Sequence, residues 1–191
     1  MIQAGLFAPG QRWSSALGEP NGATFSKDGR RRYLLWRTFD DCADRKPMVF
    51  VMLNPSTADA SVNDPTIRRC MWFARREGAG GIVVVNLSPH RATHPRDLYA
   101  AHAAGDDIVY GLKNGLTIFQ AFRMGGPVVF AWGAGVRPPL YGAIRNVRRR
   151  ALEAGQSPLC LGRTKDADPR HPLMLRNDTP LESYDGLAAA V

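Results

Sequence analysis

The chain has 191 residues, 45% of them hydrophobic and 22% charged, and its formal net charge is +8. This length predicts one domain, and this hydrophobic share suffices to bury a core. The 3 cysteines form no Cys-x-x-Cys pair, which argues against a disulfide framework or a zinc module and favours a reducing compartment. There is neither a membrane-length apolar run nor a signal-peptide pattern, so we expect a cytoplasmic protein with no membrane partner.

The surplus of positive charge admits a nucleic acid or a nucleotide as a partner, because neutralising phosphates drives such binding. Most of the positive residues are Arg rather than Lys. A GC-rich genome would produce the same bias without selection for binding, so charge alone leaves both interpretations open. It also leaves the oligomeric state undetermined.

The predicted N-terminal part, residues 1–47, is an irregular segment followed by a β-hairpin. Asp28-Gly29 is a strong turn signal, and β-prone residues flank it on both sides. Three arginines follow the turn: Arg30, Arg31 and Arg32. We expect them on a solvated strand edge, where charge discourages unwanted strand pairing, with a phosphate-facing edge as the alternative.

Residues 48–175 form the predicted core and residues 176–191 a tail, all within a single α/β domain, 1–191. Four mainly apolar stretches are predicted as buried strands, and the first is a continuous apolar run, the pattern of burial on both faces: residues 49–53, 82–87, 128–132 and 159–161. Helices are predicted between them, from residue 64 to the glycines at 78–81, over most of 98–123, and over 138–154. This alternation predicts a three-layer sandwich with a central, mainly parallel four-stranded sheet, plus the N-terminal hairpin.

The first predicted helix begins at Asp64-Pro65, a favourable N-cap followed by proline at the first helical position. Its apolar residues recur at i, i+3, i+4 and i+7, and they are Ile67, Cys70, Met71 and Ala74. Arg68, Arg75 and Arg76 share the opposite, polar side.

Polar loops follow the four predicted strands, at 54–59, 86–94, 132–135 and 163–172. Because the carboxyl ends of parallel strands meet at one edge of a sheet, we expect these loops to converge on a binding site. The candidate substrate-binding residues in them are Pro55, Ser56, Thr57, Asn86 and Gly133. Asp59 is a candidate acid–base carboxylate with His171 as a partner, whereas Asp64 is better explained as a helix cap.

Other familiar chemistries lack their motifs. There is no phosphate-binding GxxxxGK[ST], and no GxGxxG follows a predicted strand, so we expect no nucleotide cofactor. His90 and His94 are flanked by prolines and join no ligand set, so we expect no metal. Ser56 lacks the GxSxG elbow, and Cys70 lies on an apolar helix face.

The strings NPSTAD, NDPTIRRC, VVVNL and AWG occur in that order and are followed by the pattern of residues 161–173. In this order they resemble a family of bacterial and phage proteins known as a domain of unknown function. The resemblance covers most of residues 48–175 and implies no activity.

Four shorter stretches resemble the uracil-DNA glycosylase superfamily: Val51-Met-Leu-Asn-Pro55, Val83-Val-Val-Asn86, Val128-Val-Phe-Ala-Trp-Gly133 and His171-Pro172. The resemblance implies a glycosylase-like fold in which Asn54 orients a water at the anomeric carbon. It implies that Asn86 hydrogen-bonds a base edge and that His171 stabilises the leaving base or contacts phosphate, around an extruded base. Arginines would then hold backbone phosphates: Arg68, Arg75, Arg76, Arg91 and Arg170.

The sequence departs from that superfamily at two positions. Asn54 stands where the most active members have a carboxylate, and an amide cannot take a proton as a general base. Leu173 stands where the late motif has Ser. The first hypothesis is therefore an N-glycosidic hydrolase, and two alternatives stay open: a non-catalytic nucleic-acid or nucleotide-binding module, and a small-molecule hydrolase or transferase that uses Ser56 or Cys70.

Overall fold

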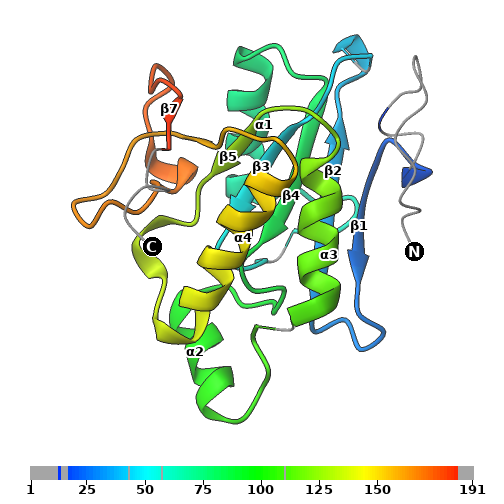
Figure 1. The fold of residues 1–191 in the computed structure, drawn as a ribbon. Coiled ribbons are helices and arrows are strands. Elements are labelled where there is room, and N and C mark those ends of the chain that lie inside the picture. The colour runs from blue at the N-terminus through cyan, green and yellow to red at the C-terminus, as the bar shows by residue number, and fades with distance from the viewer. Residues whose placement is uncertain (1–12, 14–16, 43, 57, 110, 185–191) are drawn as a thin grey trace.

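The computed structural model describes residue 13 and residues 17–42, 44–56, 58–109 and 111–184. These residues form one mixed sheet of seven strands in the order β1-β2-β4-β3-β5-β6-β7 (Figure 1). The strands are β1 (Asn21–Phe25), β2 (Arg32–Thr38), β3 (Met48–Met52), β4 (Gly81–Asn86), β5 (Val128–Phe130), β6 (Leu159–Cys160) and β7 (Glu182–Ser183). The α-helices are α1 (Pro65–Arg76), α2 (Pro95–Ala103), α3 (Gly111–Phe122) and α4 (Tyr141–Glu153).

The α/β class is confirmed, but the predicted sheet of four strands is too small, because the structure has a sheet of seven. Strands β4, β3, β5 and β6 are parallel, as expected from their apolar runs. The hairpin is not an appendage, because β2 pairs antiparallel with β4 and places Leu35 opposite Val84. Strand β7 pairs antiparallel with β6. The residue pattern of a hairpin is the same whether the hairpin stands alone or extends a larger sheet. The sequence therefore did not reveal that β2 pairs with β4.

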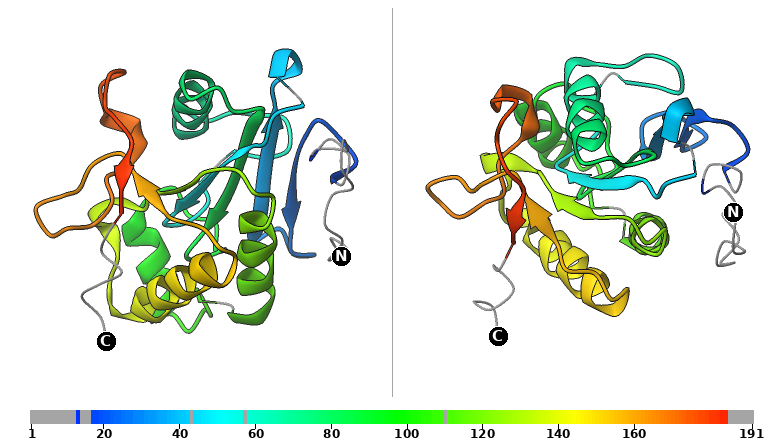
Figure 2. Two further views of the ribbon diagram at one scale, coloured as in Figure 1. Left: turned by 45° about the horizontal axis from the view of Figure 1, so that its top comes forward. Right: turned by 90° about the horizontal axis from the view of Figure 1, so that it is seen from above.

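Helices cover both faces of the sheet (Figure 2). Alternate side chains of β3 separate the two cores, since Val49 packs with residues of α3 and α4, whereas Phe50 packs with residues of α1. The two faces are called below the α3/α4 face and the α1 face. Over the described part of the chain, no helix is both long and apolar enough to cross a bilayer.

Two helix predictions had different outcomes. Asp64 caps α1 as expected, with its Oδ1 accepting a hydrogen bond from the Ile67 amide at 2.8 Å. The segment predicted as mostly helical over 98–123 is instead two helices, α2 and α3. Gly105 adopts φ +96° after α2, a backbone conformation that favours glycine and ends the helix.

Candidate functional site

A pocket of about 360 Å³ opens at the carboxyl ends of the parallel strands. Each of the four predicted loops contributes to its wall, and the first turn of α1 completes it. Across the sheet the parallel strands follow one another as β4, β3, β5 and β6. The chain therefore adds β4 on one side of β3 and then β5 and β6 on the other, so the strand order reverses at β3. Open α/β sheets bind ligands at such a reversal. The predicted residues that line the pocket are Asn54, Ser56, Asn86, Gly133 and His171.

Asn86 is the last residue of β4 and is 0% exposed. Its side chain lies on the α1 face, because it alternates in phase with Val84, which packs in the core on that face. Both side-chain atoms, Oδ1 and Nδ2, are buried and have no hydrogen-bond partner among the described residues. Burying an unpaired amide costs about 1–3 kcal/mol. Asn86 therefore holds a donor and an acceptor side by side in the pocket wall, and no described residue uses either.

Asn54 presents only an acceptor. Its Nδ2 donates to the Ala92 carbonyl at 2.7 Å and to the Pro55 carbonyl at 3.0 Å, which uses both of its hydrogens. No described group donates to its Oδ1. These bonds tie the loop after β3 to the loop after β4. A carboxylate could not replace the amide here, because both neighbours are acceptors.

The Asn54→Asp variant tests that explanation. We expect it to lower the free energy of unfolding by about 1–3 kcal/mol, because the Ala92 and Pro55 carbonyls each lose the hydrogen bond from Asn54 and then face a negative charge. Urea denaturation at neutral pH measures the effect. An Asn54→Asp protein as stable as wild type would show that the two hydrogen bonds do not hold the loops.

His171 reaches the pocket from the loop after β6. Its Nδ1 accepts a hydrogen bond from the Leu173 amide at 3.3 Å, so the proton of the neutral ring lies on Nε2. Burial lowers the pKa of His171 below its ordinary 6.5, against the opposing effect of the Asp64 carboxylate. Gly133 allows this approach, because a Cβ added there would lie 3.1 Å from the His171 Cβ, and its φ is +73°.

The lowered pKa of His171 predicts a pH-dependent stability. The unfolded chain binds this proton more readily than the folded one, so stability is complete above pH 6.5 and falls as the pH drops through the folded pKa. Burial lowers the pKa of His90 in the same direction. We expect His171→Asn to flatten part of the pH dependence of urea midpoints between pH 7 and 5, and His90→Asn another part. A slope unchanged in both variants would contradict the assignment.

Two other predicted residues, Pro55 and Asp59, do not line the pocket. Pro55 is buried, and its carbonyl accepts hydrogen bonds from Asn54 Nδ2 and the Ala92 amide, so it shapes the loop. The Asp59 carboxylate accepts from the Ser61 and Val62 amides at 2.9 and 2.8 Å, within its own turn. Those bonds lower the pKa of Asp59, which stays ionised as a turn residue. Thr57 lies outside the described residues.

The two candidate nucleophiles differ in accessibility. Ser56 lines the pocket and is partly exposed, but no described imidazole or carboxylate accepts from its hydroxyl. Cys70 is 0% exposed on the inner face of α1, and burial raises the pKa of its thiol far above the ordinary value. Neither group is activated in the way that nucleophilic catalysis needs.

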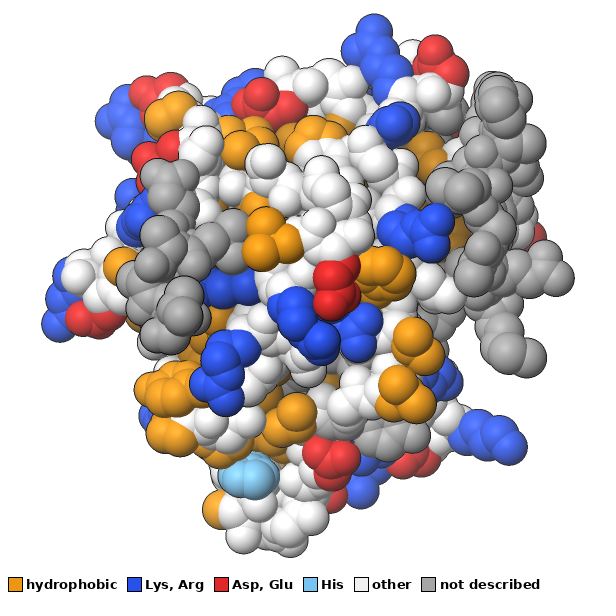
Figure 3. Space-filling model, in the orientation of Figure 1, with side chains coloured by type: hydrophobic (Ala, Val, Ile, Leu, Met, Phe, Trp, Pro, Cys, Tyr) orange, Lys and Arg blue, Asp and Glu red, His pale blue; other side chains and the backbone are white. Residues whose placement is uncertain are grey.

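The five arginines predicted to hold phosphates fall into two groups. Arg75 and Arg76 lie at the far end of α1, about 15 Å along the helix from Thr66 at the pocket. Arg75 pairs with Asp41 at 3.0 Å, and Arg76 pairs with Glu77 at 2.5 Å. The other three arginines are next to pocket-lining residues in the chain. Arg68 follows Ile67, Arg91 precedes Ala92, and Arg170 precedes His171. On the face shown in Figure 3, positive side chains are scattered among acidic and apolar ones.

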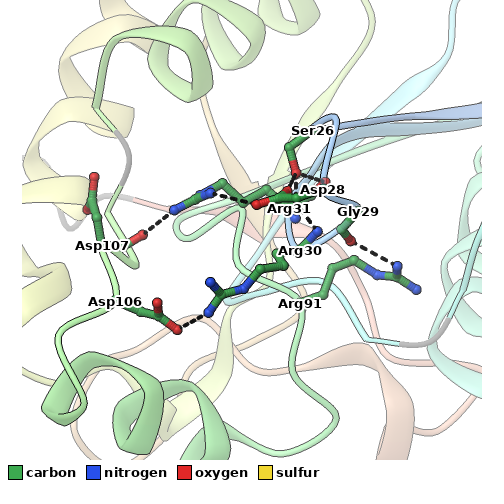
Figure 4. A network of polar contacts seen from close by, with 8 residues as sticks. All are labelled: Ser26, Asp28, Gly29, Arg30, Arg31, Arg91, Asp106 and Asp107. Atoms are coloured by element: carbon green, nitrogen blue, oxygen red, sulfur yellow. Dashed lines mark hydrogen bonds and ion pairs between the residues drawn. The ribbon is translucent and has the colours of Figure 1, made fainter.

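The arginines of the hairpin turn are mostly engaged with neighbouring loops (Figure 4). Arg30 forms an ion pair with Asp106, and Arg31 Nη2 donates to the Asp107 carbonyl at 3.4 Å. Arg91 Nη1 donates to the Gly29 carbonyl at 3.1 Å. These contacts join the turn to the loops after β4 and α2, so this surface is a structural junction.

The expectation of a solvated edge was wrong for Arg32. Strand β2 lies between β1 and β4, and Arg32 is only 2% exposed. A shift in register places Phe25 opposite Arg32 but Thr24 opposite Leu34, so Tyr33 is an extra residue, a β-bulge. Leu34 consequently packs on the α3/α4 face, whereas Arg32 lines the pocket beside Ile67 and Val84 of the α1 face.

Sequence reasoning missed several residues of the pocket wall. A cap was the favoured interpretation of Asp64 and a core position that of Trp132, which begins the predicted loop 132–135, and both line the pocket. Thr66 gave no signal because it looks like an ordinary first-turn residue. For Arg32 the sequence contained one indication of a special role: it directly precedes the apolar run 33–36. A charged residue is rarely buried in a strand unless it has a partner.

Comparison with known proteins gives one family. Residues 32–173 match the model of a family described as "Protein of unknown function (DUF1643)". The matched span begins at Arg32 and ends at Leu173, so it includes every residue that lines the pocket. Neither the curated proteins nor the solved structures give a match.

Proposed function

The chain belongs to the DUF1643 family, and since that description assigns no activity, we propose a function from the pocket itself. The protein binds a nucleobase in the pocket and hydrolyses its N-glycosidic bond. The observation that carries this proposal is the Asn86 side chain, an amide that is completely buried and unpaired beside a cavity. Such an amide is complementary to a base edge on which an N–H lies next to a carbonyl. The amide oxygen accepts from the ring N–H, and the amide nitrogen donates to the ring carbonyl.

The remaining polar groups suit the breaking of a bond to that base. The C–N bond pair leaves with the base, and His171 Nε2–H donates to the oxygen on which the negative charge develops. Asn54 Oδ1 accepts a hydrogen bond from a water and aligns its oxygen with the anomeric carbon. The water oxygen bonds to that carbon, and its proton passes to solvent. The resemblance to the uracil-DNA glycosylase superfamily supports the same roles for Asn54, Asn86 and His171.

The second candidate function is a base-binding module without turnover. The specific observation in its favour is Asn54, whose side chain can align a water but cannot take its proton. Asp64 lies in the same pocket, but its Oδ1 is committed to the α1 cap. Either function uses the same contacts with the base.

Oligonucleotides that contain single base lesions separate the two functions. Under the first, incubation with the protein leaves alkali-labile sites at one class of base, and the free base appears in solution. Under the second, every oligonucleotide stays intact although free nucleobases bind the protein. If nucleobases, nucleosides and oligonucleotides all fail to bind at physiological salt, both candidates are excluded.

A further inference from the structure

Two buried arginines of β2 differ in how their guanidinium groups are satisfied. Arg37 Nε donates to Asn63 Oδ1 at 2.7 Å, and its terminal nitrogens donate to backbone carbonyls, among them those of Trp36 at 2.8 Å and Asp59 at 2.7 Å. Arg32 has a single such bond, from Nη1 to the Ala58 carbonyl at 2.8 Å. Its Nε is buried without a partner. Arg37 is therefore a structural group, and Arg32 has donors left over in the pocket.

The charge of Arg32 is also incompletely balanced. No described carboxylate forms an ion pair with it, and a buried charge without a partner is costly. Burial lowers the pKa of Arg32 to about 10, although Asp64 acts in the opposite direction. Because Arg32 makes one hydrogen bond and no ion pair with the described carboxylates, Asp64 in the pocket wall included, its remaining donors are available to a negatively charged group. The amides of the first turn of α1, at Thr66 in the pocket wall, add a favourable field for an anion.

The position of Arg32 indicates which part of a ligand would carry that charge. Arg32 and Asn86 come from the neighbouring strands β2 and β4, and both are almost completely buried. They form the inner wall of the pocket, whereas Thr93 and Ala134 in its rim are exposed. A negative group next to Arg32 therefore belongs to the base edge rather than to the sugar-phosphate backbone at the mouth.

We propose that the base bound in this pocket carries an acidic substituent, a carboxylate on the ring edge, which Arg32 holds beside the contact with Asn86. This inference rests on the proposed function, since it names the substrate class of the same pocket. A guanidinium and a carboxylate form charge-assisted, often bidentate hydrogen bonds, which discriminate against a neutral group of the same shape.

Calorimetric titration of the wild-type protein tests the preference without any variant. The ligands are uracil, uracil-5-carboxylate, uracil-6-carboxylate and the two matching carboxamides. We expect one carboxylate to bind about 10- to 100-fold more tightly than its own carboxamide. The Arg32→Met variant should make the two affinities equal. Arg30→Met removes a positive charge from an exposed residue outside the pocket, and it should keep the preference.

The outcomes separate this inference from the proposed function. If uracil binds and each carboxylate binds no better than its carboxamide, the acidic substituent is excluded and the base pocket stands. If uridine 5′-monophosphate gains as much over uridine as the carboxylate gains over its carboxamide, the charge lies on the sugar and the assignment to the base edge fails. If inorganic phosphate binds but no uracil compound does, the proposed function fails together with the inference.

Discussion

The Asn86→Leu variant is expected to be more stable than wild type by about 1–3 kcal/mol and to bind nucleobases at least 100-fold more weakly. Stability rises because the wild-type protein buries an amide whose two polar atoms lack partners, and leucine removes that cost. Binding falls because the ring edge loses its donor and its acceptor together. Urea denaturation and calorimetry measure the two effects on the same preparation.

Asn114 provides a matched control for this variant. It too is buried, and its Oδ1 likewise lacks a partner, but its Nδ2 donates to the carbonyls of Asn86 and Leu87 at 2.9 and 3.3 Å. Asn114→Leu should therefore destabilise the protein by about 1–3 kcal/mol. Opposite signs at Asn86 and Asn114 are the signature of a group kept for a ligand. If both variants lose stability equally, Asn86 has an ordinary structural role.

The second large effect is expected at His171. If the protein cleaves an N-glycosidic bond, His171→Ala should lower the rate of base release by about 100- to 1,000-fold, the usual effect of removing one donor to a developing oxyanion. Base affinity should change less, because the interaction strengthens only as the bond breaks. Single-turnover release and equilibrium binding distinguish the two quantities.

His171→Gln is the informative companion, since glutamine keeps an N–H donor but cannot ionise. It should retain part of the rate, and the contribution of His171 ionisation to the pH dependence of the rate should disappear. A rate as low as that of His171→Ala, with the same pH profile as wild type, would mean that His171 positions the loop and does not contact the base.

The sequence predicted the parallel part of the sheet well, because strands buried on both faces must be apolar throughout. It predicted the edge at which the loops meet for the same reason, since the carboxyl ends of parallel strands point one way. The Asp64-Pro65 start of α1 was also readable, because a cap depends only on local contacts.

What the sequence did not show depends on contacts between distant segments. The hairpin joins the sheet through pairing of β2 with β4, for which the alternation of the hairpin contains no information. The bulge at Tyr33 turns Arg32 into the pocket, and a one-residue change of register cannot be read from composition. The amide at Asn54 likewise depends on a distant residue, because it donates to the Ala92 carbonyl, 38 residues along the chain.

The most direct test of the central claim is an NMR titration of ¹⁵N-labelled protein with a nucleobase, observed at the side-chain amide of Asn86. The Asn86→Leu spectrum identifies that signal by its absence. A base edge that pairs with Asn86 should shift this signal strongly as the base is added, and more than the side-chain signal of Asn114, whose Nδ2 already donates to two carbonyls. A base that saturates the protein without moving the Asn86 side-chain signal would contradict the account.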